Sequence, residues 1–256
     1  MMEVYDMTHV TLDRKRALAF LSSFGENVED LLVMVAGARL TGTIAYDTHY
    51  LRRHMLVTTQ GGIKSEGNLG ISDLKKVVQF CKKAKGATVL FSQQDMGKQL
   101  TVKCDSMTLK VPTMSSINSY SKVPFVEKIL KQTEKSMFTT YKDKQLEAHG
   151  TIDITNLKSV SSFKNFFAYP NFMISLHPEE NEFFLRAGKQ GTMQLTIDIE
   201  LTDAEGPNQR FESKFGKWLM DCTSLLDEGS AVLHMGENTF LFIQQDDSFL
   251  VIKNEA

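Results

Sequence analysis

The sequence contains only three cysteines, Cys81, Cys104 and Cys222, and they lie far apart in the chain. They form no C-x-x-C pair and have no histidine pair beside them, so neither a zinc site nor a disulfide framework is indicated. The sequence also lacks the roughly 18 consecutive apolar residues of a membrane-spanning helix and the basic and apolar regions of a signal peptide. We therefore expect reduced thiols and a soluble, cytoplasmic protein, in the host cytoplasm if the chain is viral and in the nucleus if it is eukaryotic.

Motifs for nucleotide binding and hydrolysis are absent as well. The chain has no G-x-x-x-x-G-K-[ST], G-x-S-x-G or H-E-x-x-H motif, and its histidines are dispersed. The best enzymatic alternative is the acidic run Asp198, Glu200, Asp203 and Glu205, because such carboxylates can hold Mg²⁺ for phosphodiester hydrolysis. The first two also alternate with isoleucines, as on the wet face of a half-buried strand. We expect no catalysis, metal or cofactor, and keep a Mg²⁺-dependent nuclease as the alternative.

No charge of one sign dominates the chain. It has 29 Lys and Arg against 31 Asp and Glu, a formal net charge of −2, which excludes a globally basic nucleic-acid binder but leaves material for a local basic surface. With 256 residues, 42% of them hydrophobic, the chain can bury a core for one large or two ordinary domains.

What the sequence does contain is a repeated pattern of one amphipathic helix followed by short apolar strands. The predicted helices begin near residues 12, 72, 155 and 212, at intervals of about 60, 83 and 57 residues, which indicates internal duplication. Their apolar stripes are Ala17, Leu21 and Phe24; Leu74, Val77, Val78, Cys81 and Ala84; Leu157, Val160, Phe163 and Phe167; and Phe211, Phe215, Trp218, Cys222 and Leu225.

The long middle interval predicts a domain boundary. A polar stretch rich in serine follows Pro112, and a short helix is predicted from Pro124 to Ser136. We therefore expect an N-terminal domain at residues 1–117, a connector at 118–136 and a C-terminal domain at 137–256. The predicted class is α+β, with two similar domains that each hold two repeats of a helix plus antiparallel strands.

Basic side chains recur on the predicted helices. On the second helix, four lysines project from the face opposite the apolar stripe. Such lysines can be an ordinary solvated face, or they can neutralise DNA phosphates without reading bases. The candidate DNA-binding residues are Arg14, Lys15, Arg16, Lys75, Lys76, Lys82, Lys83, Lys158, Lys164, Lys214 and Lys217.

This repeat of helices and strands resembles the DNA sliding clamps, the processivity factors of replicative polymerases, and in particular the two-domain class that includes proliferating cell nuclear antigen and phage clamps. The resemblance implies a DNA-clamp-like fold with the helices on one face of curved sheets. It further implies a homotrimeric ring around double-stranded DNA, bound without sequence preference. An edge strand near Asp105 to Val111 would pair with one near Phe183 to Lys189 of the next chain.

The resemblance also implies a groove that binds hydrophobic peptides of a DNA polymerase and a clamp loader. The corresponding positions are His49, Tyr50, Leu51, Met114, Ile117, Tyr120, Val251 and Ile252. Each of these residues is equally compatible with the core or with incidental surface. The alternative binding function is a monomeric processivity factor of the viral kind, which lies on DNA without enclosing it.

Overall fold

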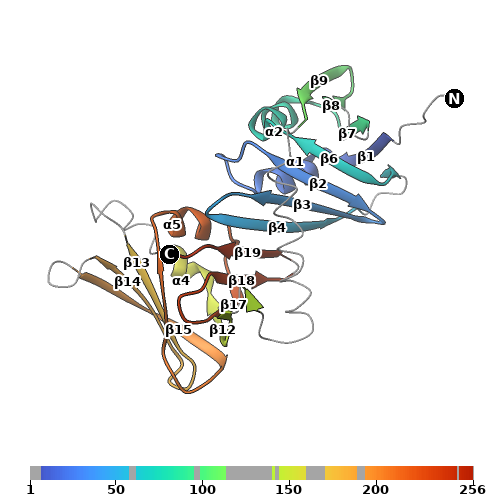
Figure 1. Ribbon diagram of the computed structural model, residues 1–256. Helices are drawn as coiled ribbons and strands as arrows, with labels where there is room; N and C mark the ends of the chain where they lie inside the picture. The colour runs from blue at the N-terminus through green and yellow to red at the C-terminus, as the bar shows by residue number, and fades with distance from the viewer. Residues whose placement is uncertain are drawn as a thin grey trace. The chain divides into compact units, whose positions relative to one another are not determined.

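The computed structural model describes residues 7–57, 62–94, 99–113, 140–141, 144–159, 171–188, 194–246 and 248–255. Contacts within the chain divide it into two compact units (Figure 1). The first unit comprises Met1–Ile44 and Arg52–Tyr120, and the second comprises Ala45–Leu51 and Ser121–Ala256. A short segment from the N-terminal half of the sequence therefore belongs to the second unit.

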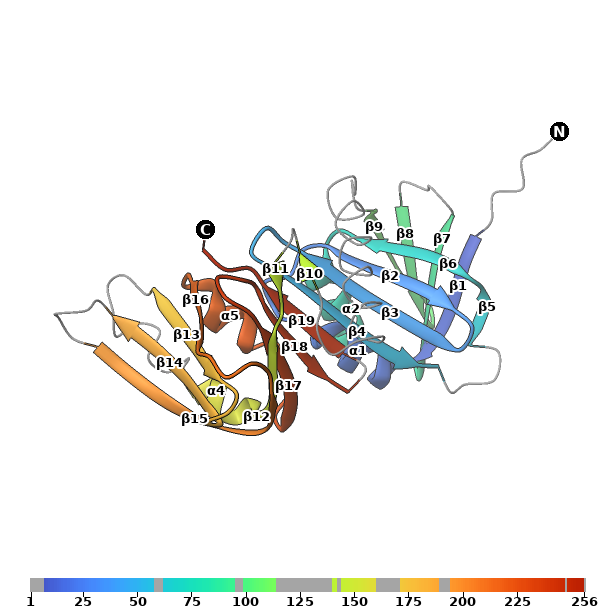
Figure 2. The same cartoon turned by 60° about the horizontal axis from the view of Figure 1, so that its bottom comes forward.

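The first unit begins with a strand, a helix and three strands, and then repeats this order. Its elements are β1 (Met7–Asp13), α1 (Arg14–Ser22), β2 (Leu31–Ala36), β3 (Arg39–Ala45), β4 (His49–Leu56), β5 (Ile63–Ser65), β6 (Gly67–Ile71), α2 (Leu74–Lys83), β7 (Thr88–Gln94), β8 (Gln99–Cys104) and β9 (Met107–Pro112). The hydrogen-bonded orders are β5-β1-β7-β8-β9 and β4-β3-β2-β6. Figure 2 shows these as two layers of strands.

The second unit has the same order of elements. They are the short β10 (Thr140–Tyr141) and β11 (Lys144–Gln145), then β12 (Ala148–Asp153), α4 (Ile154–Ser159), β13 (Phe172–His177), β14 (Glu182–Gly188), β15 (Gln194–Glu205), β16 (Phe211–Phe215), α5 (Trp218–Thr223), β17 (Ser230–Met235), β18 (Leu241–Gln245) and β19 (Ser248–Ile252). Their strand order runs β16-β13-β14-β15-β12-β17-β18-β19. In the part of this unit that the structure describes, the pairings between these strands are antiparallel.

The predicted fourfold repeat is confirmed, with one addition. The four helices start at residues 14, 74, 154 and 218, so the intervals are 60, 80 and 64 residues. Each helix is preceded as well as followed by strands, namely β1, β6, β12 and β16. The predicted α+β class with antiparallel strands is therefore correct, and the repeat unit is a strand, a helix and three strands.

The fourth predicted helix is partly wrong. Phe211, Ser213 and Phe215 alternate as the buried side chains of strand β16, and the helix starts only at Trp218. A spacing of four residues between phenylalanines satisfies a strand as well as a helix, which explains the error. Gly216 lies between the two elements. A Cβ atom at this position would lie within 2.1 Å of the Trp218 ring, so a larger residue would clash with it.

The first three helices lie close to their predicted positions but begin at different caps. Asp13 and Asp73 are the N-caps of α1 and α2, so these helices begin two residues later than predicted. In α4 the Asp153 carboxylate accepts the backbone N–H of Thr155 at 2.8 Å. These aspartates satisfy helix N–H groups that have no partner within the helix. The helix predicted at Pro124–Ser136 and the continuation of the third helix through Val160, Phe163 and Phe167 lie outside the described residues.

In the first unit α1 and α2 lie side by side against one face of the strands (Figures 1 and 2). Phe20 and Phe24 on this side contact each other edge to face, with ring centroids 5.4 Å apart. The two rings cover Gly42 of β3, where a Cβ atom would lie 2.4 Å from the Phe24 ring. A glycine is therefore required here by close approach of a side chain rather than by turn geometry.

Replacing Gly42 with alanine should lower the free energy of unfolding by about 1–3 kcal/mol, because the added methyl group overpacks the contact with Phe24. Chemical denaturation followed by circular dichroism measures the change. The double variant Gly42→Ala/Phe24→Leu should lose less than the two single changes together, since a smaller side chain accommodates the methyl group. Strict additivity of the two changes would contradict this packing.

Candidate nucleic-acid interface

Helix α2 presents a buried apolar face and an exposed basic face. Leu74, Val77 and Cys81 are buried, while the four lysines predicted for the opposite face are all exposed. The exposed set is Lys75, Lys76, Lys82 and Lys83. The helical period of 3.6 residues produces this separation, since the buried positions recur every three or four residues.

The charges along α2 are placed to favour the helix. Asp73 caps its N-terminus, accepts the backbone N–H of Lys76 at 3.1 Å and lies 2.6 Å from the Lys76 ammonium. The hydrogen bond from the Lys76 side chain holds the pKa of Asp73 below its ordinary value. Lys82 and Lys83 lie in the last turn, where the helix dipole favours cations. Three of the four lysines therefore make no ion pair with a described residue, and their charges face solvent.

Lys85 extends this basic surface and was not included among the predicted residues. It is exposed, two residues beyond the end of α2. The run Lys82-Lys83-Ala84-Lys85 is the sequence signal that indicates it.

The three basic residues of α1 have different surroundings. The Arg14 guanidinium is half-buried, donating from Nε to the Gly86 carbonyl at 2.8 Å and from Nη1 to the Cys81 carbonyl at 3.0 Å. It thus satisfies carbonyl groups at the C-terminal end of α2. Lys15 and Arg16 are exposed, and Arg16 donates to the Leu56 carbonyl at 2.8 Å. Arg14 therefore joins the two helices, whereas Lys15 is available to solvent.

Replacing Arg14 with glutamine should lower the free energy of unfolding by about 1–3 kcal/mol, because it leaves α2 carbonyl groups without their charged donor. The neighbouring change Lys15→Gln is the matched control and should alter stability by less than about 0.5 kcal/mol. Urea denaturation of both variants checks the difference. Equal effects of the two changes would show that Arg14 does not hold α2.

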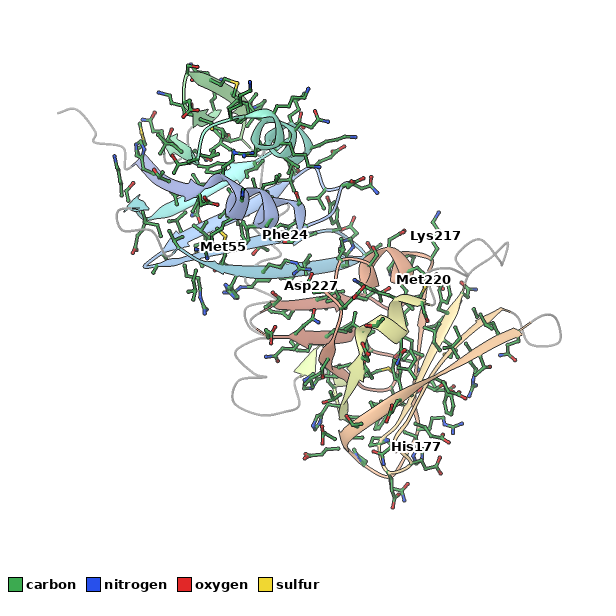
Figure 3. The ribbon with its side chains drawn as sticks, turned by 180° about the vertical axis from the view of Figure 1, so that it is seen from behind. Phe24, Met55, His177, Lys217, Met220 and Asp227 are labelled. Carbon is green, nitrogen blue, oxygen red and sulfur yellow. The ribbon has the colours of Figure 1, made fainter. Side chains whose placement is uncertain are left out.

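The helices of the second unit carry fewer exposed cations in the part of the chain that is described. Lys158 of α4 is half-buried, and Lys217 is exposed at the start of α5 (Figure 3). Lys164 lies outside the described residues. Lys214 lies on strand β16 rather than on a helix, so its predicted helical placement is wrong, and its ammonium is 2.9 Å from the Glu255 carboxylate. The exposed Asp221 of α5 further reduces the local positive charge.

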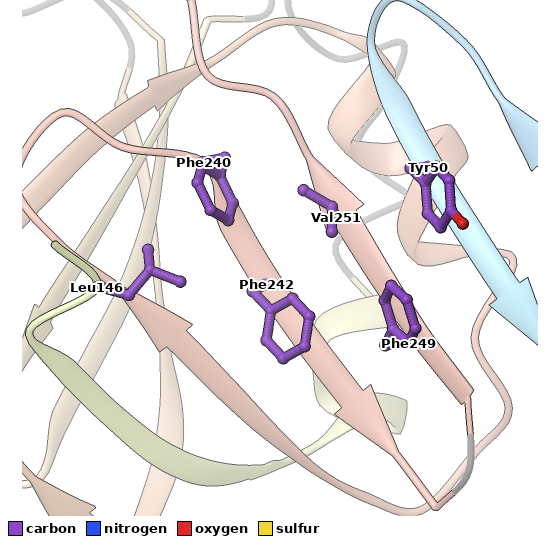
Figure 4. Packing of buried hydrophobic residues seen from close by; sticks show 6 residues of the cluster. All are labelled: Tyr50, Leu146, Phe240, Phe242, Phe249 and Val251. Carbon is purple, nitrogen blue, oxygen red and sulfur yellow. The ribbon is translucent and has the colours of Figure 1, made fainter. Parts of the chain in front are cut away.

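Two of the residues predicted for the peptide groove contribute to a buried cluster. Tyr50 and Val251 pack with other apolar side chains of the second unit, shown in Figure 4. The remaining members are Leu146, Phe240, Phe242 and Phe249. Leu51 and Ile252 have no exposed surface. These four predicted groove residues are therefore not exposed apolar side chains in this structure, because both faces of the sheet are covered at residues 50–51 of β4 and 251–252 of β19. Met114, Ile117 and Tyr120 lie outside the described residues.

His49 begins strand β4 within the second unit and is half-buried. Its ring packs against Tyr46 with centroids 5.0 Å apart, and its Nδ1 lies 3.0 Å from the Thr48 hydroxyl. Burial lowers the pKa of His49 to about 4, although the negative charge of Asp221 opposes this shift. Burial also lowers the pKa of His149, opposed by Glu205. Both rings are therefore neutral in the folded protein near pH 7.

Acid should consequently weaken the fold through His49. Its pKa falls from an ordinary value of 6.5 to about 4 on folding, so between these values the unfolded chain binds more protons. The contribution is fully present above pH 6.5 and is lost as the pH falls toward 4. A His49→Asn variant should recover about 1–2 kcal/mol of the stability that the wild type loses between pH 7 and pH 4, after allowance for solvent screening. Urea denaturation at both pH values, with His177→Asn as the control, measures this difference.

The acidic residues considered for a metal site lie along strand β15. Asp198 and Glu200 are exposed and alternate with the half-buried Ile197 and the buried Ile199, as on the solvated face of a strand. Asp203 has a φ of 49° within the same strand. Among the described residues, no group of three or more His, Cys, Asp or Glu side chains could hold a metal ion.

The three cysteines all lie in the protein core. All three cysteines are free and buried, and burial raises the pKa of Cys81 to about 11 and that of Cys222 to about 12. These two thiols are therefore protonated and poor nucleophiles at neutral pH. None of the helices in the described ranges is long and apolar enough to cross a membrane.

The fourfold repeat, the antiparallel strands and the adjacent helix pairs define the fold of the DNA polymerase sliding clamps. The chain superimposes on the sliding clamp of Caulobacter crescentus with a TM-score of 0.71 at 11% identity, over 100% of this chain and 68% of that one. It is similar to PCNA of A. fulgidus, in a complex with the C-terminal region of FEN-1, with a TM-score of 0.63 at 12% identity, over 97% and 98% of the two chains.

A third structure of this fold is the Helicobacter pylori beta clamp bound to a DNA ligase peptide, with a TM-score of 0.65 at 10% identity. The match covers 96% of this chain and 65% of that clamp, so this chain spans about two thirds of the bacterial clamps. No protein-family model matches the sequence, and no curated protein matches it. The similarity therefore lies in the fold.

Proposed function

We propose that this protein is a non-catalytic sliding clamp that encircles duplex DNA as a ring of three chains and tethers a replicative DNA polymerase. The observation that carries this proposal is the exposed basic face of α2, next to Lys15 of α1, on a chain with the sliding-clamp fold. Such lysines neutralise phosphates and read no bases, which suits a protein that must move along any sequence.

The proposed domains are those expected from the sequence, residues 1–117 and 137–256, joined by a connector at 118–136. The candidate DNA contacts are exposed side chains of the two helix pairs, chiefly Lys15, Lys75, Lys76, Lys82 and Lys83, with Arg16, Lys85 and Lys217 beside them. Arg14 is left out because its guanidinium binds α2 carbonyl groups, and Lys214 because its ammonium binds Glu255.

We further propose that hydrophobic peptides of the polymerase and of a clamp loader bind this protein. One solved structure of this fold is bound to the C-terminal region of FEN-1, and another is bound to a DNA ligase peptide. The candidate residues are His49 at the start of β4 and, around the start of the connector, Met114, Ile117 and Tyr120. The buried Tyr50, Leu51, Val251 and Ile252 would support the site from below without forming its surface.

A monomeric processivity factor is the second candidate, and the uneven charge of the two units supports it. The described helices of the second unit offer only Lys158 and Lys217, so a single basic face in the first unit could lie on DNA without a ring. A ring should stay on closed circular DNA and leave linear DNA by its ends, whereas a monomer should bind both equally and lose affinity steeply with salt.

The charge reversal Lys82→Glu/Lys83→Glu should reduce retention on circular DNA by about tenfold or more in low salt, because it removes two phosphate contacts and adds repulsion. The matched control is Lys64→Glu/Lys253→Glu, which reverses two exposed lysines away from α2 and should retain DNA as the wild type does. Gel filtration of protein on nicked circular plasmid, before and after linearisation, gives the measurement. Wild-type retention by the α2 variant would show that DNA contacts another surface.

A further inference from the structure

Strand β12 joins two groups of strands in the second unit. In the order β16-β13-β14-β15-β12-β17-β18-β19 it lies between the two groups, and it pairs with β15 on one side and with β17 on the other. Strand β14 is interior to the first group, so the free edge expected near Phe183–Lys189 is wrong. Because β12 joins the groups, a change that weakens its pairing with β17 separates them.

Two histidines face each other across this pairing. His149 of β12 lies directly opposite His234 of β17, and their rings stack with centroids 5.4 Å apart and an interplanar angle of 24°. Each of the two residues is only 5% exposed. His234 also contacts the ring of Phe242, opposite it on β18, edge to face at 5.4 Å. Phe242 is a member of the buried cluster in Figure 4, so the histidine pair borders that cluster.

The described charged groups beside the pair are acidic and lie next to His149. Glu205 of β15 is opposite His149, and its carboxylate is 3.9 Å from the His149 Nε2. Glu147 is half-buried two residues before His149, and Asp203 is exposed two residues before Glu205. On the other side of the pair, the residue opposite His234 is an apolar phenylalanine. The acids therefore favour a proton on His149 more than one on His234.

The environment of the pair accommodates one proton more easily than two. Burial lowers the pKa of His149 and Glu205 opposes this shift, so the first proton in acid is held between His149 and that carboxylate. A second proton, on His234, would place two positive rings directly opposite each other, and like charges at such positions destabilise a sheet. Burial adds the cost of removing the second charge from water. The closed pair therefore holds at most one proton, whereas two separated and hydrated rings hold two.

We propose that the pair His149 and His234 is an acid-sensitive lock, which holds β12 against β17 while at least one ring is neutral and releases these strands when both rings are protonated. Since opening takes up at least one proton, the stability of the lock is fully present above about pH 6.5 and is lost as the pH falls below it. Release of β17 would also loosen the buried cluster that contains Phe242. The inference concerns the second unit alone and holds whether or not the chain forms a ring.

Hydrogen–deuterium exchange followed by mass spectrometry tests the lock at pH 7.5 and pH 5.0, after correction for the intrinsic pH dependence of amide exchange. In the wild type, opening of β12 and β17 should increase about 30-fold or more between these values, because it takes up at least one proton. Strand β14 and helix α2 contain no histidine and should change by less than about threefold.

Two variants separate protonation from packing. His149→Phe/His234→Phe keeps two aromatic rings that cannot be protonated, so the opening of β12 and β17 should change by less than about threefold with pH. Glu205→Gln removes the carboxylate that holds the first proton, so the increase in acid should be about threefold larger than in the wild type. The matched control His177→Phe changes a histidine of β13 and should behave as the wild type does.

Circular dichroism at pH 7.5 verifies the fold of each variant, and Glu205→Gln decides the test alone if the double phenylalanine variant does not fold. An equal increase in that double variant and in the wild type would overturn the lock. An unchanged pH dependence in Glu205→Gln would also overturn it. Acid-induced exchange that rises uniformly over the whole second unit would contradict the lock too, since β12 and β17 would then not be released first.

Discussion

Burial of the apolar stripe of α2 is the interaction on which the candidate DNA surface depends. Leu74, Val77 and Cys81 are buried to within 1% of their surface, and each is separated from the next by three or four residues. When this stripe packs against the protein, the helical period directs the lysines of α2 away from the core and toward solvent. The basic face therefore follows from the packing, and its side chains keep their solvation until they meet an anion. Arg14 secures the same arrangement from α1, because its guanidinium occupies the last carbonyl groups of α2.

This dependence also explains which parts of the fold could be predicted. In α2 the apolar period, the capping aspartate and the terminal lysines all indicate a helix, and the predicted start near residue 72 lies two residues before the observed one. Phe211 and Phe215 were ambiguous, because a spacing of four residues fits both periods and the intervening Ser213 is buried although polar. Its hydroxyl accepts the backbone N–H of Thr239 at 2.8 Å, which satisfies a buried group that local sequence cannot reveal.

The candidate partner site shows a different limit. Tyr50 and Val251 have the residue types of a binding groove, but types alone do not say which face of a strand is covered. Here Tyr50 stacks on Phe249 with centroids 5.8 Å apart, as part of a cluster assembled from three strands and Leu146 (Figure 4). Contacts between residues about 200 positions apart decide the exposure of such side chains, and a single sequence carries no direct record of them. The same reasoning applies to sheet edges, since whether a strand has one neighbour or two depends on the whole topology.

The distribution of charge then resolves the apparent conflict between a net charge of −2 and a role on DNA. Attraction between exposed charges is screened over about 8 Å at physiological ionic strength, so what a phosphate meets is the local surface and not the whole chain. The lysines of α2 form two adjacent pairs about 10 Å apart along the helix axis, whereas Asp198 and Glu200 lie on a strand of the other unit. Acidic residues can therefore offset the net positive charge of the lysines and arginines without neutralising the basic face of α2. The resulting net charge also limits non-specific binding to polyanions.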